Sequence, residues 1–493
     1  MNKKHLFLVV FFLPFLIFFS FFFSFFRIDI FYTNDLHGRI DVLPKIAYYI
    51  KKTKTKNYIV LDSGDFIQGT PESNFFKGQS MVDVMNNVGY TAVCLGNHEF
   101  DFSEQNIYEL KKQAKFDFLG SNIYSHYGTV KPYITNYLVK EFDGIKLGIF
   151  GILTTQTKYI VIPQNLKDVE ILDELLITQK VVNQLVYNNV DIIICVSHIG
   201  VSENKENFVD DKILAEKIQK INFIIGGHTH KKYMIKIGKT LLVQTGANGK
   251  ELGHLKLFFF KPYKKIFFYK NKFIVINSLK DDKNVKSIIE RYLKKINEIF
   301  DEEIGELKFD LPHYRDKESP LGDLVCDIMN RIAKCDFAVT NSGGLRKSLT
   351  KGIIKYRDIY TLCPFDNTIV KINLLGREIK DVFEHSFSGN YGILQVSKEV
   401  KIECDLNSPV GSRVKNIQIN NKSLLPDKTY SVATNSFLAS GGEGYFWFTK
   451  HNIVDTKILL REAIVNYIKE NKKISLPLGN QEQRIIIVSN QKK

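Results

Sequence analysis

The 493-residue chain is too long for one hydrophobic core, so its length predicts at least two domains. Its content of 44% hydrophobic and 13% aromatic residues excludes a chain that is disordered throughout. The net charge of +15 favours anionic partners, but a composition rich in Lys, Asn, Ile and Phe explains most of it without one. No basic run has the shape of a nucleic-acid-binding arm, so nucleic acid is not expected as a partner.

The first predicted element is an apolar segment at the N-terminus. Lys3 and Lys4 precede a run of about 20 apolar residues that ends at Phe26, which is long enough to span a bilayer. No small-residue cleavage site of the A-x-A type is evident. Residues 1–26 are therefore predicted to be a signal peptide or a retained membrane anchor. The protein is predicted to be exported, to the periplasm or to the outer face of the cytoplasmic membrane.

One pattern then recurs across 27–280, which is predicted to be a single domain. A short apolar run of strand length ends abruptly in a polar cluster, and segments with helical spacing, such as Ser80–Val88 and Ser103–Ala114, lie between these runs. The runs are IDIFYTNDLHG (28–38), YIVLDSGD (58–65), TAVCLGNHEFD (91–101), DIIICVSHIG (191–200) and INFIIGGHTH (221–230). Buried α/β sheets produce such strands, and ligand sites form at their carboxyl ends.

The polar residues at these strand ends predict a metal centre. They are Asp35, His37, Asp65, Asn97, His198, His228 and His230. Carboxylate, amide and imidazole groups suit borderline divalent ions such as Zn²⁺, Mn²⁺ or Fe²⁺. Seven ligands exceed the need of one tetrahedral ion, and sharing them around a bridging Asp65 suits two ions about 3.5–4 Å apart. Any one of these residues alone is more simply a core or loop residue, so the prediction rests on their joint occurrence.

The local geometry of two motifs is also predicted. The D-x-H and H-x-H motifs are expected to be extended, because alternate side chains of an extended segment point to one side. The run GNHEFD places His98 and Asp101 three residues apart, so the carboxylate can orient the imidazole and favour its charged form. Such a histidine can stabilise charge on a phosphoryl group or protonate a leaving oxygen. Glu99 has no assigned role and is expected to be solvated or structural.

A change in pattern follows at 281–303. The stretch has helical periodicity with dense alternating charge, and it is predicted to be a solvated linker helix between domains. From 304 to 490 the chain carries new motifs and no internal repeat, which predicts a different second domain. The six cysteines form no CxxC motif and are expected to be free buried thiols, although an exported protein could form one or two disulfides.

The motifs D-x-H, GDxxQGTP, GNHEFD, SHxG and GHTH, in this order, resemble the 5′-nucleotidase family, which includes bacterial UDP-sugar hydrolases and animal ecto-5′-nucleotidases. The resemblance covers about 28–490 and is closest over 64–101. It implies an α/β protein with an N-terminal four-layer αββα metallophosphoesterase domain. The linker helix would join this domain to a C-terminal α/β 5′-nucleotidase domain that binds the substrate.

The resemblance also implies roles for the strand-end residues. One metal would be held by Asp35, His37, Asp65 and His230, and the other by Asp65, Asn97, His198 and His228. His98 and Asp101 would form the catalytic dyad. Some family members have Gln at the last position of GHTH, so His230 predicts a first metal site with a different preference. The expected cofactors are two divalent ions, with Zn²⁺ or Mn²⁺ favoured.

The second domain contains residues that the resemblance assigns to substrate binding. By itself NSGGLR (341–346) is a Gly-rich loop that could cradle phosphate or be a turn, and Arg315 is a surface residue. Phe365 and Phe437 would usually be core. The resemblance implies that the two phenylalanines stack on the base, that Arg315 and Arg346 hold phosphate or ribose, and that Asn341 and Gly344 match base-side positions.

One position departs from the family pattern. The family motif GGDG has an Asp that binds the ribose hydroxyls, whereas this chain has GGEG with Glu443. The longer side chain puts the mode of ribose recognition in question.

Three functional hypotheses follow. The leading one is an exported two-metal phosphohydrolase that acts on nucleoside 5′-monophosphates. The second keeps the metal site but changes the substrate to a 2′,3′-cyclic nucleotide, a nucleotide sugar or a dinucleotide. The third is a non-catalytic surface-binding protein, which is expected to have lost a ligand or dyad residue, and none is lost. The expected partner is a nucleotide substrate, and the N-terminal segment leaves membrane attachment open.

Overall fold

The computed structural model describes residues 25–202, 209–260, 265–474 and 483–487, which divide into two compact units. Unit 1 comprises Met1–Gln68, Phe75–Thr157 and Leu166–Tyr292, and unit 2 comprises Gly69–Asn74, Lys158–Asn165 and Leu293–Lys493. Most of the predicted signal or anchor segment, residues 1–24, lies outside the described residues. Among the described helices, none combines the length and apolar content that crossing a bilayer requires.

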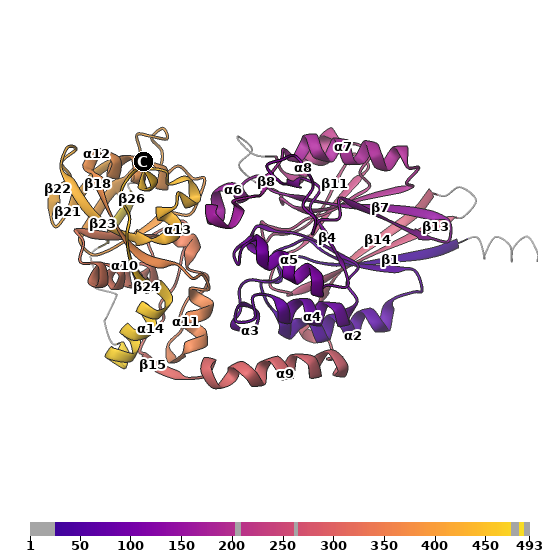
Figure 1. The fold of residues 1–493 in the computed structure, drawn as a ribbon, viewed down its shortest axis with the longest axis horizontal. Helices are drawn as coiled ribbons and strands as arrows, with labels where there is room; N and C mark the ends of the chain where they lie inside the picture. Colours follow the sequence, from indigo (N-terminus) through magenta and orange to yellow (C-terminus); the bar gives the residue numbers. More distant parts are fainter. Residues whose placement is uncertain (1–24, 203–208, 261–264, 475–482, 488–493) are drawn as a thin grey trace, which may run out of the picture. The chain divides into compact units, whose positions relative to one another are not determined.

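Unit 1 is built on two six-stranded sheets within the described residues (Figure 1). Sheet 1 runs in the order β14 (Lys265–Val275), β13 (Glu251–Phe260), β1 (Phe25–Thr33), β2 (Tyr58–Asp62), β3 (Ala92–Cys94) and β4 (Asp117–Leu119). Sheet 2 runs in the order β11 (Lys232–Ile237), β12 (Thr240–Thr245), β10 (Phe223–Ile225), β9 (Ile192–His198), β7 (Ile145–Leu153) and β6 (Tyr137–Phe142). Strands β1 to β4 are parallel, as are β7, β9, β10 and β12, so the carboxyl ends of the central strands in each sheet share one edge.

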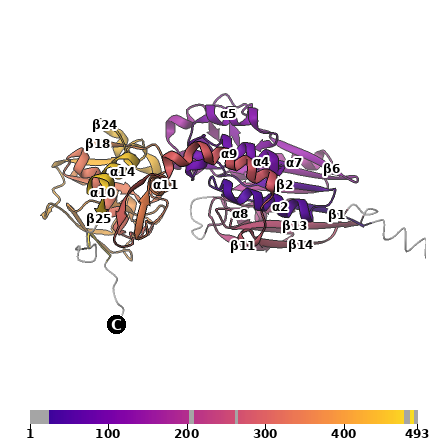
Figure 2. The same cartoon turned by 90° about the horizontal axis from the view of Figure 1, so that it is seen from below.

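The two sheets pack face to face and helices cover their outer faces. The core between the sheets contains residues of both, such as Ile30 and Leu61 from sheet 1 and Ile149 and Ile194 from sheet 2. The helices α7 (Glu174–Tyr187) and α8 (Asp211–Lys217) pack on the outer face of sheet 2. The helices α2 (Leu43–Thr53), α4 (Gln79–Val88) and α5 (Glu104–Gln113) form the layer on sheet 1, and α2 and α4 lie side by side (Figures 1 and 2). These layers are the αββα arrangement that was predicted.

Helix α9 (Lys283–Phe300) occupies the stretch for which a charged helix was predicted. The boundary between the two units falls inside it, between Tyr292 and Leu293. The hydroxyl of Tyr292 donates a hydrogen bond of 3.1 Å to Asp83 in unit 1, and the ring of Phe300 lies 5.5 Å from that of Tyr356 in unit 2. Each half of the helix therefore packs on its own unit.

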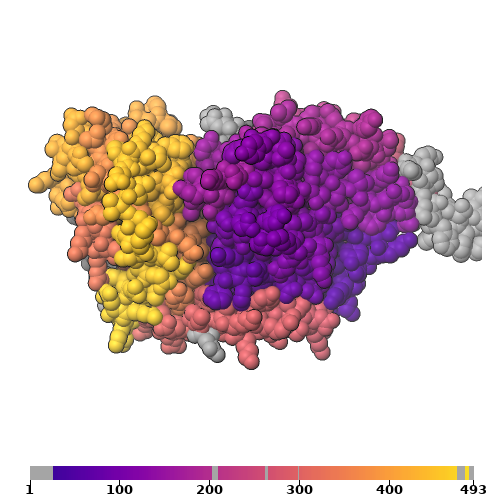
Figure 3. Space-filling view, in the orientation of Figure 1, coloured from indigo at the N-terminus to yellow at the C-terminus, as the bar shows by residue number. Residues whose placement is uncertain are grey.

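Unit 2 is a second α/β unit with two hydrophobic cores. Its main sheet runs in the order β19 (Leu394–Val396), β16 (Phe337–Asn341), β23 (Thr429–Asn435), β18 (Thr368–Leu375) and β24 (Val454–Leu459). Two smaller sheets are formed by β22 (Lys422–Ser423), β21 (Val414–Ile419), β20 (Val400–Cys404) and β26 (Ile485–Ile487), and by β17 (Gly352–Lys355), β15 (Glu303–Leu307) and β25 (Lys473–Ile474). Its longer helices are α10 (Pro320–Ala333), α11 (Tyr356–Leu362), α12 (Gly376–Ser386) and α14 (Leu460–Asn471). The space-filling view shows the last part of the chain, in yellow, lying over the orange part of this unit (Figure 3).

All six cysteines are free, and five of them are buried, with Cys335 partly exposed. The prediction of free and mostly buried thiols is therefore confirmed. Burial raises the pKa of the Cys363 thiol to about 12, so this group stays protonated at neutral pH. The cysteines belong to the packing of the two units.

Candidate active site

The predicted metal ligands all follow the carboxyl ends of unit 1 strands. Asp35 and His37 follow β1, Asp65 follows β2, and Asn97 begins the short 3₁₀ helix η2 (Asn97–Phe100) after β3. His198 is the last residue of β9, and His228 and His230 lie in the loop after β10. Sheets 1 and 2 each contribute ligands, which brings side chains from five separate segments to one edge of the sandwich.

The prediction that the D-x-H and H-x-H segments are extended is wrong. Five of the seven predicted ligands have a left-handed backbone: Asp35 (φ 50°), His37 (φ 48°), Asp65 (φ 58°), His228 (φ 72°) and His230 (φ 57°). Asp and His tolerate this region better than most residues, but each such residue still costs roughly 1–3 kcal/mol. The side chains therefore converge because tight loops turn them inward, and the surrounding structure has to hold those loops.

Hydrogen bonds between the loops supply this support. The N–H of Asp35 donates to the carbonyl of Gly64 at 3.0 Å, and the N–H of His37 donates to the carbonyl of Asp65 at 2.8 Å. The N–H of His228 donates to both oxygens of Asp35, at 3.0 and 3.1 Å. The loops after β1 and β2 are thereby connected through their backbones, and the loop after β10 is connected to them through the Asp35 carboxylate.

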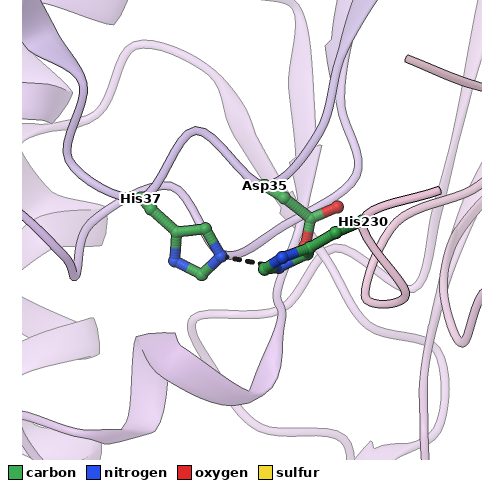
Figure 4. Close-up of side chains that lie close together, drawn as sticks. All are labelled: Asp35, His37 and His230. Atoms are coloured by element: carbon green, nitrogen blue, oxygen red, sulfur yellow. Dashed lines mark hydrogen bonds and ion pairs between the residues drawn. The ribbon is translucent and has the colours of Figure 1, made fainter. Parts of the chain in front are cut away.

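The first group of candidate ligands is Asp35, His37 and His230 (Figure 4). The Nε2 atoms of His37 and His230 are 2.9 Å apart, and Nε2 of His230 is 3.5 Å from Oδ1 of Asp35. His37 has its Nδ1 3.1 Å from the carbonyl oxygen of Gln68, so Nδ1 carries the proton and Nε2 presents a lone pair. A nitrogen lone pair and a carboxylate oxygen converging in this way fit a divalent cation.

The second group is Asp65, His198 and His228, with Asn97 beside it. The Nδ1 atom of His198 is 2.5 Å from the carbonyl oxygen of Ser63 and acts as the donor there. Its buried Nε2 has no hydrogen-bond partner but lies 3.2 Å from Oδ2 of Asp65. Nδ1 of His228 lies 3.1 Å from Oδ1 of Asn97. A buried imidazole nitrogen that faces only a carboxylate, beside a second imidazole and an amide oxygen, fits a site that a cation would complete.

Electrostatics at the site favour positive charge. Burial would raise the pKa of Asp65, but the imidazoles of His198 and His98 hold it well below its usual range. Burial would lower the pKa of His198, but the carboxylates of Asp65 and Asp35 raise it to about 10. Burial and the neighbouring His198 lower the pKa of His228 to about 3. The neighbouring carboxylates therefore keep His198 protonated. A bound divalent ion would supply positive charge here in place of that proton.

His98 and Asp101 form a close pair. Nδ1 of His98 is 2.6 Å from Oδ2 of Asp101, so the carboxylate accepts the Nδ1 proton and fixes the ring orientation. The N–H of His98 donates to Oδ1 of Asp65 at 2.8 Å, and its Nε2 lies 4.0 Å from Oδ2 of the same residue. The Nε2 of His98 therefore lies at the margin of the candidate metal centre, close to ligand atoms of Asp65 and His37.

Glu99 is structural, and the alternative that it is solvated is wrong because only 1% of its surface is exposed. Its Oε1 accepts hydrogen bonds from the N–H groups of Phe66 (2.8 Å) and Ile67 (3.3 Å). Its Oε2 accepts from the N–H groups of Asp65 (2.9 Å) and Gly96 (2.6 Å). The carboxylate thus ties the loop that carries Asp65 to the loop that carries Asn97, a role that no local sequence pattern revealed.

Two glycines explain why the motifs need residues without side chains. A Cβ at Gly96 would clash with Oδ1 of Asp65 and would lie 2.6 Å from the Asp65 backbone nitrogen. Gly64 has φ +91°, and a Cβ there would come within 2.6 Å of the Gly96 nitrogen and 2.8 Å of the His198 Nδ1. The two loops approach so closely that a methyl group would displace candidate ligands.

Unit 2 brings several predicted substrate-binding residues together. Nδ2 of Asn341 donates to Oε1 of Glu443 at 2.9 Å, and Nδ2 of Asn435 donates to Oδ1 of Asn341 at 3.0 Å. Glu443 is 6% exposed, has φ +52°, and its Oε2 is buried without a hydrogen-bond partner. Burial raises the pKa of Glu443, while Asn341 and the charges of Arg315 and Arg346 oppose this rise.

The remaining predicted residues have different surroundings. Gly344 adjoins the Asn341 amide, because a Cβ there would lie 3.1 Å from its Oδ1. Phe437 packs against the core of unit 2, and its ring lies over Gly442. Phe365 follows α11 and is partly exposed.

His313 was missed by the sequence analysis. Both of its ring nitrogens are buried without a hydrogen-bond partner, and burial together with Arg315 and Arg346 lowers its pKa to about 4. The ring is therefore neutral at physiological pH and lies in the field of the two arginines. The sequence signal that could have identified it is its position two residues before Arg315. A single histidine in a loop does not by itself indicate a functional role.

Comparisons with known proteins agree with this arrangement. The family model for calcineurin-like phosphoesterases matches residues 28–232, and the model for the 5′-nucleotidase C-terminal domain matches 299–450. The venom 5′-nucleotidase of Gloydius brevicauda is 29% identical, over 85% of this chain and 82% of its own length. The 5′-nucleotidase of Vibrio cholerae is 27% identical, over 92% of both chains. The crystal structure of a 5′-nucleotidase precursor from Thermus thermophilus is 28% identical, with a TM-score of 0.84 over 94% of this chain and 100% of that chain.

The αββα unit, the convergent ligands and the first family match define a metal-dependent phosphoester hydrolase. With the C-terminal match and relatives named 5′-nucleotidase in bacteria and animals, the chain belongs to the 5′-nucleotidase family. The resemblance, the two-domain α/β fold and the enzyme class that the motifs predicted are confirmed.

Proposed function

We propose that this chain is an exported hydrolase that releases phosphate from nucleoside 5′-monophosphates with two divalent ions, Zn²⁺ or Mn²⁺. The observation that carries the proposal is the position of Asp65. Its carboxylate belongs to a ligand group with His198 and His228, and it also offers a ligand atom close to that of His37, a member of the other group. A carboxylate shared in this way is the bridging ligand that a two-metal centre requires.

Each ion has its own set of residues in this proposal. Asp35, His37, Asp65 and His230 hold one ion, and Asp65, Asn97, His198 and His228 hold the other. When bound, the two ions would neutralise phosphate charge and make a water molecule nucleophilic at neutral pH. The imidazole tautomers are already set for this purpose, because the carbonyls of Gln68 and Ser63 take the Nδ1 protons of His37 and His198.

His98 has a separate task beside the ions. Asp101 holds its Nδ1 proton at 2.6 Å and stabilises the charged ring, which leaves Nε2 to act on the substrate. From there Nε2 can donate a hydrogen bond to the phosphoryl group as negative charge develops, and a proton to the ester oxygen as the P–O bond breaks. Such a positioned group contributes roughly 10²–10⁴ in kcat.

Unit 2 is proposed to recognise the nucleoside. Phe365 and Phe437 would stack on the base, Arg315 and Arg346 would hold anionic or hydroxyl groups, and Asn341, Gly344 and Glu443 would read polar groups. The buried, unpartnered Oε2 of Glu443 supports this role, because a ligand hydroxyl would satisfy it. We also propose that the chain divides into a catalytic domain (27–280), a linker helix (281–303) and a nucleotide-binding domain (304–490).

A substrate panel with metal add-back tests the proposal. The metal-stripped chain is given Zn²⁺ or Mn²⁺ and assayed for phosphate release from AMP and ADP, and for cleavage of UDP-glucose, NAD and 2′,3′-cyclic AMP. The expected result is fastest turnover of AMP. Preference for the cyclic nucleotide, or for UDP-glucose or NAD, would establish one of the alternative hydrolases instead. Tight nucleotide binding without turnover at full metal occupancy would establish a binding protein.

Export is tested in cells. Activity is expected outside the cytoplasm and accessible to added AMP while the inner membrane is intact. Recovery of all activity in the soluble cytoplasmic fraction would contradict export. Extraction of the active chain with salt alone, without detergent, would contradict a retained anchor.

A further inference from the structure

The outer face of sheet 1 at β1, β13 and β14 carries a cluster of cations and aromatic rings. Cross-strand register aligns Arg27 with Phe258 and Phe258 with Phe268, and in the next row Asp29 with Lys256 and Lys256 with Lys270. Aligned residues share a face. The alternate residues of β13, such as Leu257, point into the sandwich core. We call the opposite side the Lys–Phe face, and it comprises Arg27, Lys256, Phe258, Phe268, Lys270 and Lys272.

The aromatic part of this face is exposed. The rings of Phe258 and Phe268 stack with centroids 4.1 Å apart and an angle of 12° between planes, and 47% of Phe268 is exposed. The register shift between Phe258 and Phe259 leaves Phe267 beside this pair, and 68% of Phe267 is exposed. Large apolar rings clustered in solvent cost free energy unless another surface covers them.

The same face also carries a cluster of positively charged side chains. Burial lowers the pKa of the Lys256 ammonium group. The nearby charges of Arg27, Lys272 and Lys270 lower it further. The acid in the same rows, Asp29, is buried and is held by Arg27 (3.0 Å) and His254 (3.0 Å). The face therefore presents concentrated positive charge. Lysines on an edge strand such as β14 also discourage pairing with other chains, but this purpose does not account for the exposed stacked rings.

The position of the face along the chain indicates what covers it. Strand β1 begins at Phe25, which is aligned with Phe260, so the last two residues of the apolar run that ends at Phe26 belong to the strand. The row of Arg27, Phe258 and Phe268 therefore begins directly after that run. An apolar run of about 20 residues partitions into lipid. Because this run continues directly into β1, it would bring this end of sheet 1 to a bilayer.

We propose that the Lys–Phe face lies against the surface of an anionic phospholipid bilayer. Phenylalanine side chains enter the boundary between headgroups and acyl chains, and the lysines pair with the lipid phosphates, while Arg27 stays paired with Asp29. Each lysine near an anionic membrane contributes about a fivefold factor in binding. The face would hold unit 1 in one orientation on the membrane, which a single flexible anchor cannot do.

The test uses the full chain reconstituted in vesicles that contain bromine-labelled lipid. Phe268→Trp places a fluorophore on the face, and the parent chain, which has one Trp, supplies the background. Tyr127→Trp is the matched control, because Tyr127 is 94% exposed on a loop elsewhere in unit 1. Vesicles of phosphatidylcholine are compared with vesicles that also contain phosphatidylglycerol.

The expected result is that the fluorescence of the Phe268→Trp variant is quenched only when phosphatidylglycerol is present, while that of the Tyr127→Trp variant is not quenched. Lys270→Gln with Lys272→Gln should lower the docked fraction, by about 25-fold in the docked-to-free ratio. Lys167→Gln with Lys180→Gln, on exposed positions of the same unit, should leave it unchanged. Equal quenching in both tryptophan variants, quenching without anionic lipid, or oligonucleotide binding that depends on Lys270 and Lys272 without lipid docking would overturn the proposal.

Discussion

Replacing Glu99 by Gln tests whether the loops that carry the candidate ligands are held as the structure indicates. The change keeps the shape of the side chain and replaces neither a candidate ligand nor His98. It removes one of two acceptor oxygens that together receive four backbone N–H groups, from Asp65, Phe66, Ile67 and Gly96. The new amide nitrogen is a donor and would face two of these donors.

The size of the effect follows from those bonds. Each buried N–H left without an acceptor costs about 1–3 kcal/mol, so two of them cost about 2–6 kcal/mol. Both donors to Oε1 and one of the two donors to Oε2 lie in the segment Asp65–Ile67, so the penalty falls mainly on the loop that aims the Asp65 carboxylate. A loss of about 2 kcal/mol in metal binding corresponds to a dissociation constant about 30-fold higher.

The assay is metal affinity by competition with a chelator, with kcat for AMP measured at saturating metal. Glu109→Gln is the control, because Glu109 is exposed and its carboxylate pairs with Gln105 and Lys112 on the surface. Unchanged metal affinity and turnover in Glu99→Gln would refute the view that this carboxylate organises the site.

Other variants follow from the same geometry. Asp65→Asn should abolish activity and lower metal content, and retention of full metal occupancy would contradict its bridging role. His98→Ala should keep the metals while kcat falls roughly 10²–10⁴-fold, so undiminished turnover would remove His98 from the chemistry. Gly96→Ala should weaken metal binding because its Cβ would enter the space of Asp65, whereas normal affinity would show that the loop yields easily. Phe365→Ala and Phe437→Ala should each remove roughly 1–3 kcal/mol, seen in KM for nucleotides but not for a small phosphate ester without a base, and equal losses would make both rings structural.

Much of the site could be predicted because chemistry and secondary structure coincide in the sequence. Apolar runs of strand length ended at the candidate ligands, and parallel strands carry their carboxyl ends to one edge. Asp35, Asp65 and His198 were therefore recognisable without tertiary information. The helices α4 and α5 also lie where helical spacing was found.

The failures share a physical cause. The residue pattern predicts an extended backbone for Asp35 and His37, but the backbone is left-handed because contacts with the loop after β2 determine it. Glu99 bonds to backbone groups more than 30 residues away, and His313 is defined by its distance from Arg315 and Arg346 in space. Residue types do not reveal partners that are backbone atoms or come from distant segments.

The stoichiometry of metal activation tests the central claim most directly. The metal-stripped chain is titrated with Zn²⁺ or Mn²⁺, and bound metal and AMP hydrolysis are measured in the same samples. The account predicts two ions per chain at saturation, with turnover that rises as the second ion binds. Full activity with one bound ion, or without any, would contradict a two-metal centre bridged by Asp65.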